Sequence, residues 1–141
     1  MTEFLIDETL KNDCHMLGRI QNCYLMLMDN TELPWFILVP VTTETEYYRL
    51  SDIEQLEINN AINWISEFLV REYRPDKINV ASIGNVVKQM HIHVVGRFET
   101  DYCWPGVVWG VEVNSPYYSE QVDEIRKRIK VQLQELFEEI A

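Results

Sequence analysis

The sequence predicts an α+β fold, in which two main helices pack on an antiparallel sheet of about five strands. Two short apolar runs near the start are separated by a short connection, a long helical pattern fills the middle of the chain, and a second helical pattern ends it. Strands joined by short connections favour antiparallel pairing, because parallel strands need a long crossover. The order of strands, helix, strands and helix therefore favours an α+β arrangement.

The first strands are predicted on either side of a turn. The runs CYLMLM at 23–28 and WFILV at 35–39 flank the segment 29–34, whose Asp, Asn and Pro are typical of a connection. A preceding strand is expected over 15–20, and two later ones over 77–82 and 89–98.

Two helices are predicted from capping and spacing. Ser51-Asp52-Ile53-Glu54 is a capping box, in which the Ser hydroxyl and the Glu carboxylate each satisfy a free N–H at a helix start. Apolar residues then recur at helical spacing until Pro75 ends the pattern. A second amphipathic helix is expected over about 118–140, where apolar residues step by three and four: Val122, Ile125, Ile129, Leu133, Leu136 and Ile140.

Length and charge limit the possible functions. The chain has 141 residues without a repeat or a Gly/Ser-rich linker, so a single domain over 1–141 is predicted. Twelve Lys and Arg against 23 Asp and Glu give a net charge of -11, which disfavours binding to nucleic acid or to an anionic membrane. A small phosphate site remains compatible with that charge, because backbone N–H groups can hold an anion locally.

Composition also predicts where the protein works. No apolar run approaches the roughly 20 residues that a membrane helix needs, and the first residues are acidic where a signal peptide would be basic. Cys14, Cys23 and Cys103 are odd in number and have no C-x-x-C spacing, so reduced thiols that pack in the interior are expected. These features predict a cytoplasmic protein.

The segment most informative about function is 84–97, GNVVKQMHIHVVGR. On a strand alternate residues share a face, so Gln89, His91 and His93 are expected to project together while the apolar residues between them face the core. By itself, His-x-His is also typical of two solvent-facing histidines. A metal pair is a further alternative, but it needs more ligands. The only other histidine is His15, and no nearby Cys or acidic cluster has ligand spacing, so no metal is predicted.

This segment resembles the histidine triad (HIT) family, in which a Gly-(Gln/Asn)-(Ser/Thr)-Val-x loop precedes a His-x-His-x-His strand and two apolar residues. The matching positions are Gly84, Asn85, Val87, His91, His93, Val94 and Val95. Upstream, Asp29-Asn30 resembles the ribose-contacting pair of the family, and Leu38-Val39-Pro40 resembles its strand that ends in Pro. The resemblance covers about 10–110 and implies a HIT-like fold.

Two positions depart from the family pattern. Gln89 stands where the first triad histidine would be, and Val86 stands where the family usually has Ser or Thr. The resulting Gln-x-His-x-His, with Asp101, Trp104-Pro105 and Val108-Trp109-Gly110, resembles a bacterial subgroup of about this length. By resemblance, both departures lie on the leaving-group side of the phosphate.

The resemblance implies a role for each site residue. His91 would attack the α-phosphate of a nucleotide and form a nucleotidyl-histidine, and His93 would donate to a phosphate or leaving-group oxygen. The N–H groups of the loop from Gly84 to Val87, including Val86, would surround the phosphate. The remaining candidates are Asp29 and Asn30 for the ribose hydroxyls, and Asn79 and Asn85 for phosphate or ribose, each with an ordinary turn or strand-end role as the alternative.

The predicted function is a nucleotidyl hydrolase or transferase without a cofactor, acting on a nucleoside phosphate derivative. Dinucleoside polyphosphates such as diadenosine tetraphosphate are favoured, because Gln89 cannot protonate the poor amine leaving group of a phosphoramidate. The alternatives are a nucleotide-binding protein with little turnover and a dimeric interaction module with incidental histidines.

Since HIT proteins dimerise by joining their sheets, a homodimer is expected. Trp35, Trp104 and Trp109 are interpreted as packing or interface residues, with contact to the base as the alternative.

Overall fold

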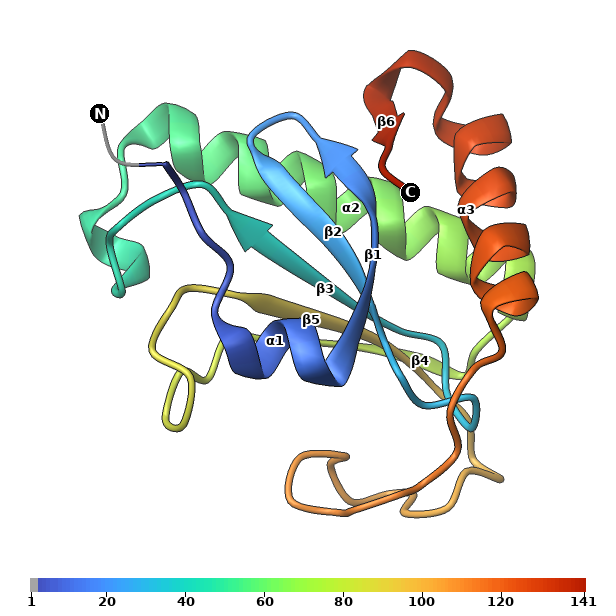
Figure 1. The fold of residues 1–141 in the computed structure, drawn as a ribbon. Coiled ribbons are helices and arrows are strands. Elements are labelled where there is room, and N and C mark those ends of the chain that lie inside the picture. The colour runs from blue at the N-terminus through green and yellow to red at the C-terminus, as the bar shows by residue number, and fades with distance from the viewer. Residues whose placement is uncertain (1–2) are drawn as a thin grey trace.

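The computed structural model describes residues 3–141. Met1 and Thr2, the first two residues of the predicted domain and of its acidic start, lie outside the described residues. Six antiparallel strands form one sheet in the order β4-β5-β3-β2-β1-β6 (Figure 1). The strands are β1 (Cys14–Ile20), β2 (Cys23–Met28), β3 (Trp35–Pro40), β4 (Lys77–Ala81), β5 (Ile92–Arg97) and β6 (Phe137–Glu139). The helices are α1 (Glu8–Asp13), α2 (Asp52–Tyr73) and α3 (Ser119–Leu133), with single 3₁₀ turns at Tyr47–Arg49 and Gln134–Leu136. The predicted α+β class is confirmed.

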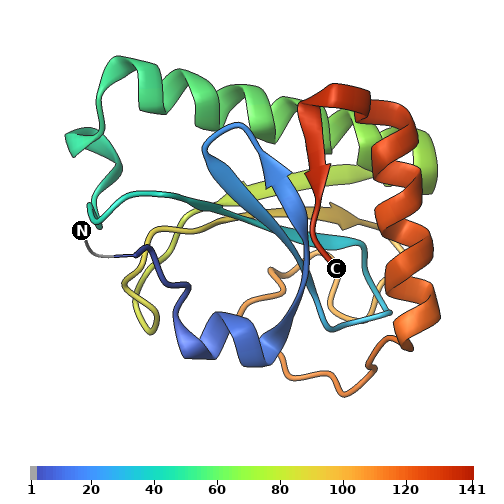
Figure 2. The ribbon, with the colours of Figure 1, turned by 45° about the horizontal axis from the view of Figure 1, so that its top comes forward.

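The sheet is covered on both faces, which explains why its central strand is fully buried. Helices α2 and α3 cover one face, and α1 with the segment 98–118 covers part of the other (Figures 1 and 2). The side chains of strand β3 alternate between these two faces. Phe36 and Leu38 join the core under the helices, whereas Trp35 and Ile37 join the core on the opposite face. The candidate site lies on this second face.

Helix α2 begins and ends where the sequence predicts. The Glu54 N–H donates to the Ser51 hydroxyl at 3.2 Å, and the Ser51 N–H donates to the Glu54 carboxylate at 3.1 Å, which completes the capping box. Arg74 leaves the helix in the left-handed region with φ 50°, and Pro75 follows. Within residues 3–141, no helix is long and apolar enough to cross a bilayer.

The predicted C-terminal helix over 118–140 is too long. Helix α3 ends at Leu133, Gln134 turns the chain with φ 54°, and β6 pairs with β1 instead. The side chain of Phe137 is fully buried beside Gly18, where a Cβ atom would collide with both the Phe137 ring and the Glu138 carbonyl. The last apolar residues of the chain therefore follow a turn into an edge strand and do not continue the helix.

The start of β5 and the presence of α1 also differ from the prediction. Strand β5 begins at Ile92, three residues later than predicted, because the Gln89 carbonyl accepts a hydrogen bond from the His91 ring instead of joining the ladder. The short helix α1, capped by the Asp7 side chain, was not predicted.

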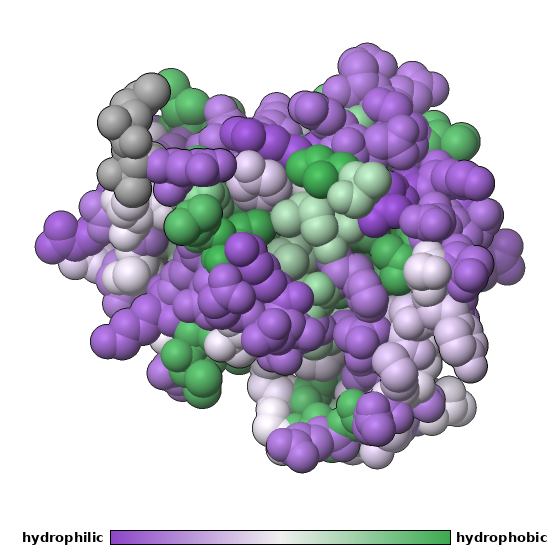
Figure 3. Space-filling model, in the orientation of Figure 1, coloured by the Kyte–Doolittle hydropathy of each residue, from purple (hydrophilic) through white to green (hydrophobic). Residues whose placement is uncertain are grey.

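In Figure 3, polar side chains cover most of the face that carries α1, and apolar side chains are visible over the first two strands.

Candidate active site

His91 and His93 lie on the sheet face opposite α2, at the start of β5. Both are buried, and their ring centroids are 5.0 Å apart. The apolar residues that alternate with them, Met90, Ile92 and Val94, belong to the core under the helices. The period of two in the sequence therefore assigns these five side chains to the correct faces.

The His91 ring is oriented by the backbone two residues before it. Its Nδ1 lies 2.7 Å from the Gln89 carbonyl oxygen. A carbonyl can only accept, so Nδ1 carries the proton and the neutral ring keeps its lone pair on Nε2. Because the ring lines a cavity, this lone pair is the nucleophile that the site can offer to an electrophilic phosphorus.

The His93 ring lies between two indoles. Its Nδ1 accepts a hydrogen bond of 3.0 Å from Trp35 Nε1, and its centroid lies 5.3 Å from that of Trp109. Burial, followed by the neighbouring His91 charge, lowers the pKa of His93 to about 4. His93 is therefore a neutral hydrogen-bond donor near pH 7.

A cavity of about 600 Å³ opens in front of the two histidines. The loop from Gly84 to Val87 forms one wall and Trp109 contributes to another. Gly84 adopts φ 72°, a conformation that favours glycine and that turns the loop toward the histidines. Val86 is 92% exposed, so the position where the family has a hydroxyl is at the solvent side of the loop.

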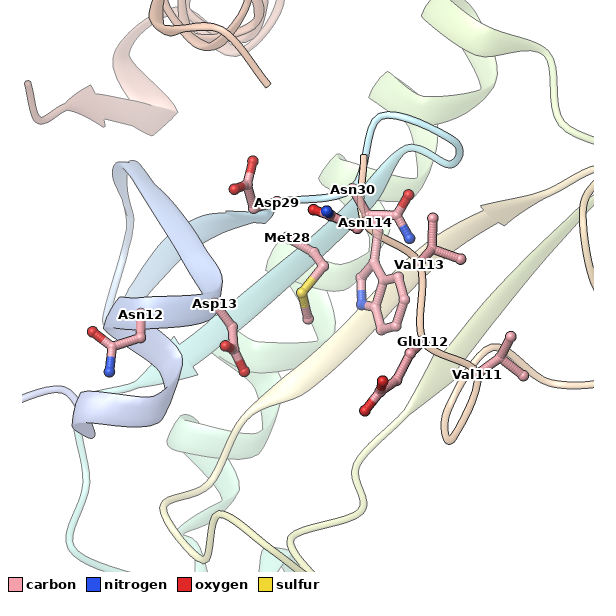
Figure 4. Close-up of a pocket in the computed structure, with 10 residues that line it drawn as sticks. Asn12, Asp13, Met28, Asp29, Asn30, Val111, Glu112, Val113 and Asn114 are labelled. Carbon is pink, nitrogen blue, oxygen red and sulfur yellow. The ribbon is translucent and has the colours of Figure 1, made fainter. Parts of the chain in front are cut away.

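A second cavity of about 700 Å³ adjoins the first. The two share the lining residues Asp13, Met28, Trp35, Val111 and Glu112, and so form one cleft. Figure 4 shows the end of α1 on one side of the second cavity and residues 111–114 on the other, with Met28 between them. The cleft therefore runs from the two histidines to the end of β2 and the end of α1.

Asp29 and Asn30 lie at the far end of this cleft. Asp29 Oδ1 accepts from His15 Nε2 and from the Tyr117 N–H, each at 2.8 Å. Both of these bonds use Oδ1, which leaves Oδ2 for a ligand hydroxyl. Asn30 is buried and is held by Tyr102 and by the Glu32 N–H, so its side chain mainly serves the turn.

Two predicted site residues are not brought to the cleft. The Gln89 amide accepts from the Asp7 N–H and donates to the Leu5 carbonyl, each at 2.8 Å, so its side chain holds the N-terminal segment. The Gln89 amide is therefore bound to the segment before α1, which packs with Trp35 on the histidine face of the sheet. Asn79 accepts from Arg97 at 2.9 Å and belongs to a different cluster. Neither residue lines the two cavities.

The described residues that line the cleft include three carboxylates, Asp13, Asp29 and Glu112, and no Lys or Arg. The cationic side chains closest in sequence to the two histidines do not line the cleft: Lys88 is exposed, and Arg97 is buried against Asp101. Within residues 3–141, no group of three or more His, Cys, Asp or Glu is arranged to hold a metal ion. Neutral donors must therefore hold any phosphate in this cleft.

Sequence reasoning missed several lining residues. From the sequence, Trp35 and Trp109 are interpreted as packing or interface residues with contact to the base as the alternative, and Asp13 and Glu112 have no assigned role. The alternation along 35–39 does place Trp35 on one face with Ile37 and Val39. What was missing is the pairing of β3 with β5, which sets Trp35 diagonally across from His93.

Comparison with known proteins agrees with this architecture. The HIT domain family model matches residues 9–100. A histidine triad protein from Sinorhizobium meliloti is 34% identical, with a TM-score of 0.88 over 94% of this chain and 99% of that one. One from Marinobacter aquaeolei is also 34% identical, with a TM-score of 0.88 over 96% and 99%. A diadenosine triphosphate hydrolase from Plasmodium falciparum shares the fold at 18% identity, with a TM-score of 0.58 over 96% and 90%. No curated protein matches the sequence.

Proposed function

This chain belongs to the HIT domain family, and from that premise we propose that it is a nucleotidyl hydrolase or transferase that cleaves at the α-phosphate of a nucleoside phosphate derivative. The observation that carries the proposal is the 2.7 Å hydrogen bond from His91 Nδ1 to the Gln89 carbonyl. It places the proton of the neutral ring on Nδ1, so the lone pair of this cavity-lining histidine lies on Nε2 and needs no separate base to free it.

The reaction we propose has two steps. His91 Nε2 attacks the α-phosphorus, a P–N bond forms, and the bond from phosphorus to the leaving group breaks. His93 donates its Nε2 proton in a hydrogen bond to the phosphate or the leaving oxygen, and N–H groups of the loop 84–87 hold the non-bridging oxygens. Water or another acceptor then attacks the same phosphorus: a P–O bond forms, the P–N bond breaks, and the proton of the attacking hydroxyl passes to solvent. The nucleotide leaves and His91 regains its Nε2 lone pair.

We propose that Asp29 holds the ribose hydroxyls, since Asp29 Oδ2 remains for them at the end of the cleft away from His91. We include Asn85 among the phosphate contacts because it lines the histidine cavity with Gly84 and Val87. Asn30 would act by fixing the turn that carries Asp29. For Asn79, the bond to Arg97 supports a structural role.

The substrate class we propose is a dinucleoside polyphosphate, with diadenosine tetraphosphate as the example. Position 89, where the first triad histidine would stand, has an amide that is already bound to the N-terminal segment. A polyphosphate is a good leaving group without protonation, whereas an amine is not. The same feature supports placing the chain in a bacterial subgroup with Gln-x-His-x-His.

The alternative function is nucleotide binding with little turnover, and the occupied Gln89 amide is the observation that favours it. The two can be separated by trapping a radiolabelled nucleotidyl-protein from a panel of diadenosine polyphosphates, adenosine phosphoramidates and nucleotide sugars. We expect an adduct and AMP release with wild type, and neither with His91→Ala, while AMP binding survives because it draws on the loop and on Asp29. Tight AMP binding by wild type without an adduct would establish the alternative, and retained turnover in His91→Ala would remove His91 from the mechanism.

Two expectations about the state of the protein accompany this proposal. We propose a homodimer, supported by the apolar side chains over the first two strands (Figure 3) and by the exposed Val80 on the outer strand β4. We propose a cytoplasmic location, supported by three free cysteines, of which Cys14 and Cys23 are buried.

A further inference from the structure

We propose that Trp35 is a positioning residue of the reaction, whose indole N–H selects the His93 tautomer that keeps a proton on Nε2, facing the substrate. This inference rests on the proposed function for its catalytic meaning, but the tautomer itself can be measured without any turnover.

The hydrogen bond between the two rings has one possible direction. An indole nitrogen is a donor and never an acceptor, so Trp35 Nε1, at 3.0 Å, must donate to His93 Nδ1. His93 Nδ1 must then hold a lone pair, and the proton of the neutral ring must sit on Nε2. Trp35 is 7% exposed and His93 is 5% exposed, so little water competes for this bond.

The sheet fixes the geometry of the pair. In the antiparallel ladder between β3 and β5, Trp35 lies opposite Val95 and Ile37 lies opposite His93, so the two rings are diagonal neighbours on one face. The Trp109 ring packs edge-to-face against both, with centroids 5.3 Å from His93 and 6.3 Å from Trp35. The imidazole is therefore held from two sides and does not turn over freely.

The two histidines consequently carry their protons on opposite nitrogens. The Gln89 carbonyl places the His91 proton on Nδ1 and leaves Nε2 as a nucleophile, whereas the Trp35 indole places the His93 proton on Nε2 and makes it a donor. One acceptor and one donor from the surrounding chain thus give two adjacent imidazoles different roles. Both assignments are made before substrate binds, so they cost no reorganisation in the transition state.

The same bond resists protonation of His93. A second proton could only bind at Nδ1, where it would meet the indole N–H and break the bond. The titratable groups that share the cavity are His91 beside the ring, Asp13 at the end of α1 and Glu112 on the segment 98–118. The carboxylates favour a cationic ring, whereas burial, the neighbouring His91 charge and the indole N–H oppose it.

Trp35→Phe keeps an aromatic ring but removes the N–H donor together with part of the ring volume, so a control with the same loss of volume is needed. The matched control is Trp64→Phe, which makes the same change at a partly buried position of α2 that packs against the core on the other face of the sheet. The tautomer and the pKa of His93 are read from the ¹⁵N shifts of its ring nitrogens between pH 4 and 8, and kcat and KM are measured over the same range.

In wild type we expect the neutral His93 ring to be protonated on Nε2 and to resist titration down to about pH 4. In Trp35→Phe we expect a population with the proton on Nδ1, and a pKa raised by at least about one unit toward its ordinary value. We expect kcat to fall by about three- to tenfold, which is the effect of losing one hydrogen bond, with KM changed less than about twofold. Trp64→Phe should match wild type in all of these.

The inference is overturned if wild-type His93 carries its proton on Nδ1, a result that needs no variant. It is also overturned if Trp35→Phe titrates or turns over like Trp64→Phe. Failure of the proposed function has a different signature, because wild type would then form no nucleotidyl adduct while the His93 spectrum still showed the Nε2 proton.

Discussion

Replacing Asp101 with Asn should cost more stability than any surface change, because Asp101 organises the segment that carries Trp109 to the cleft. Its carboxylate accepts from Arg97 Nε at 2.8 Å and from the N–H groups of Phe98, Cys103 and Trp104 at 3.0, 3.1 and 2.8 Å. The Arg97 and Asp101 side chains are each 2% exposed. An Asn side chain has one acceptor oxygen in place of two and leaves the Arg97 charge unpaired in the interior.

Two magnitudes can be worked out. Breaking a buried ion pair by removing one partner typically costs about 3–5 kcal/mol at neutral pH. Burial alone would raise the pKa of Asp101, but the hydrogen bonds from Arg97, Phe98 and Cys103 lower it from 3.8 to about 2. Above pH 4, this depressed pKa contributes about 2 kcal/mol to the free energy of unfolding. The contribution is lost as the pH falls toward 2, because the carboxyl takes up its proton at a higher pH in the unfolded chain than in the folded one. The Asp101→Asn variant has no carboxyl group at this position, so its free energy of unfolding lacks this pH-dependent contribution.

Urea unfolding followed by circular dichroism tests both numbers. We expect the free energy of unfolding of Asp101→Asn to be about 3–5 kcal/mol lower than that of wild type at pH 7. This difference in unfolding free energy should narrow by up to about 2 kcal/mol as the pH falls toward 2. The control is Asp123→Asn, which breaks the pair with Arg126 at 2.7 Å, where Asp123 is 64% exposed; it should cost less than about 1 kcal/mol. Equal unfolding free energies for the two variants at pH 7 would refute the reasoning.

Two further predictions concern association and charge. Sedimentation at micromolar concentration and ordinary salt should give the mass of a dimer, and a monomeric mass would contradict the proposed homodimer. Asp13→Asn combined with Glu112→Gln should lower KM for a dinucleoside polyphosphate more at low salt than at high salt, because two carboxylates of the cleft would no longer repel the substrate. A KM that does not change at low salt would show that neither carboxylate lies near the phosphates.

The features that sequence reasoning predicted are those determined by neighbours in the chain. The capping box needs only Ser51 and Glu54, and the alternation of histidines with apolar residues needs only the period of a strand. The failures involve distant partners. Trp35 and His93 are 58 residues apart, and the Gln89 amide meets the Leu5 carbonyl across 84 residues. Likewise, the end of the chain pairs with β1 as an edge strand, where Gly18, far away in the sequence, leaves room for the Phe137 ring.

The position of Gln89 changes what its side chain is expected to do. The sequence alone suggested that Gln89 lies beside the leaving group and sets the preference for anhydrides over phosphoramidates. Both polar atoms of its amide are instead bound to the N-terminal segment, at 2.8 Å each, just before α1 carries Asp13 to the cleft. The preference would then follow from the absence of an acid at position 89 and not from an action of the amide.

Gln89→Ala separates these two roles. If the amide anchors the N-terminal segment, losing two hydrogen bonds of about 1 kcal/mol each should speed hydrogen exchange at the Asp7 amide by at least about tenfold. KM should rise for every substrate as α1 loosens, and the ratio of kcat for anhydride to kcat for phosphoramidate should stay within about twofold of wild type. The His91 ring should keep its tautomer, since its partner is the backbone carbonyl of residue 89, which the substitution retains. A changed ratio with unchanged exchange at Asp7 would place the amide at the leaving group after all, because an anchor acts on both substrate classes alike.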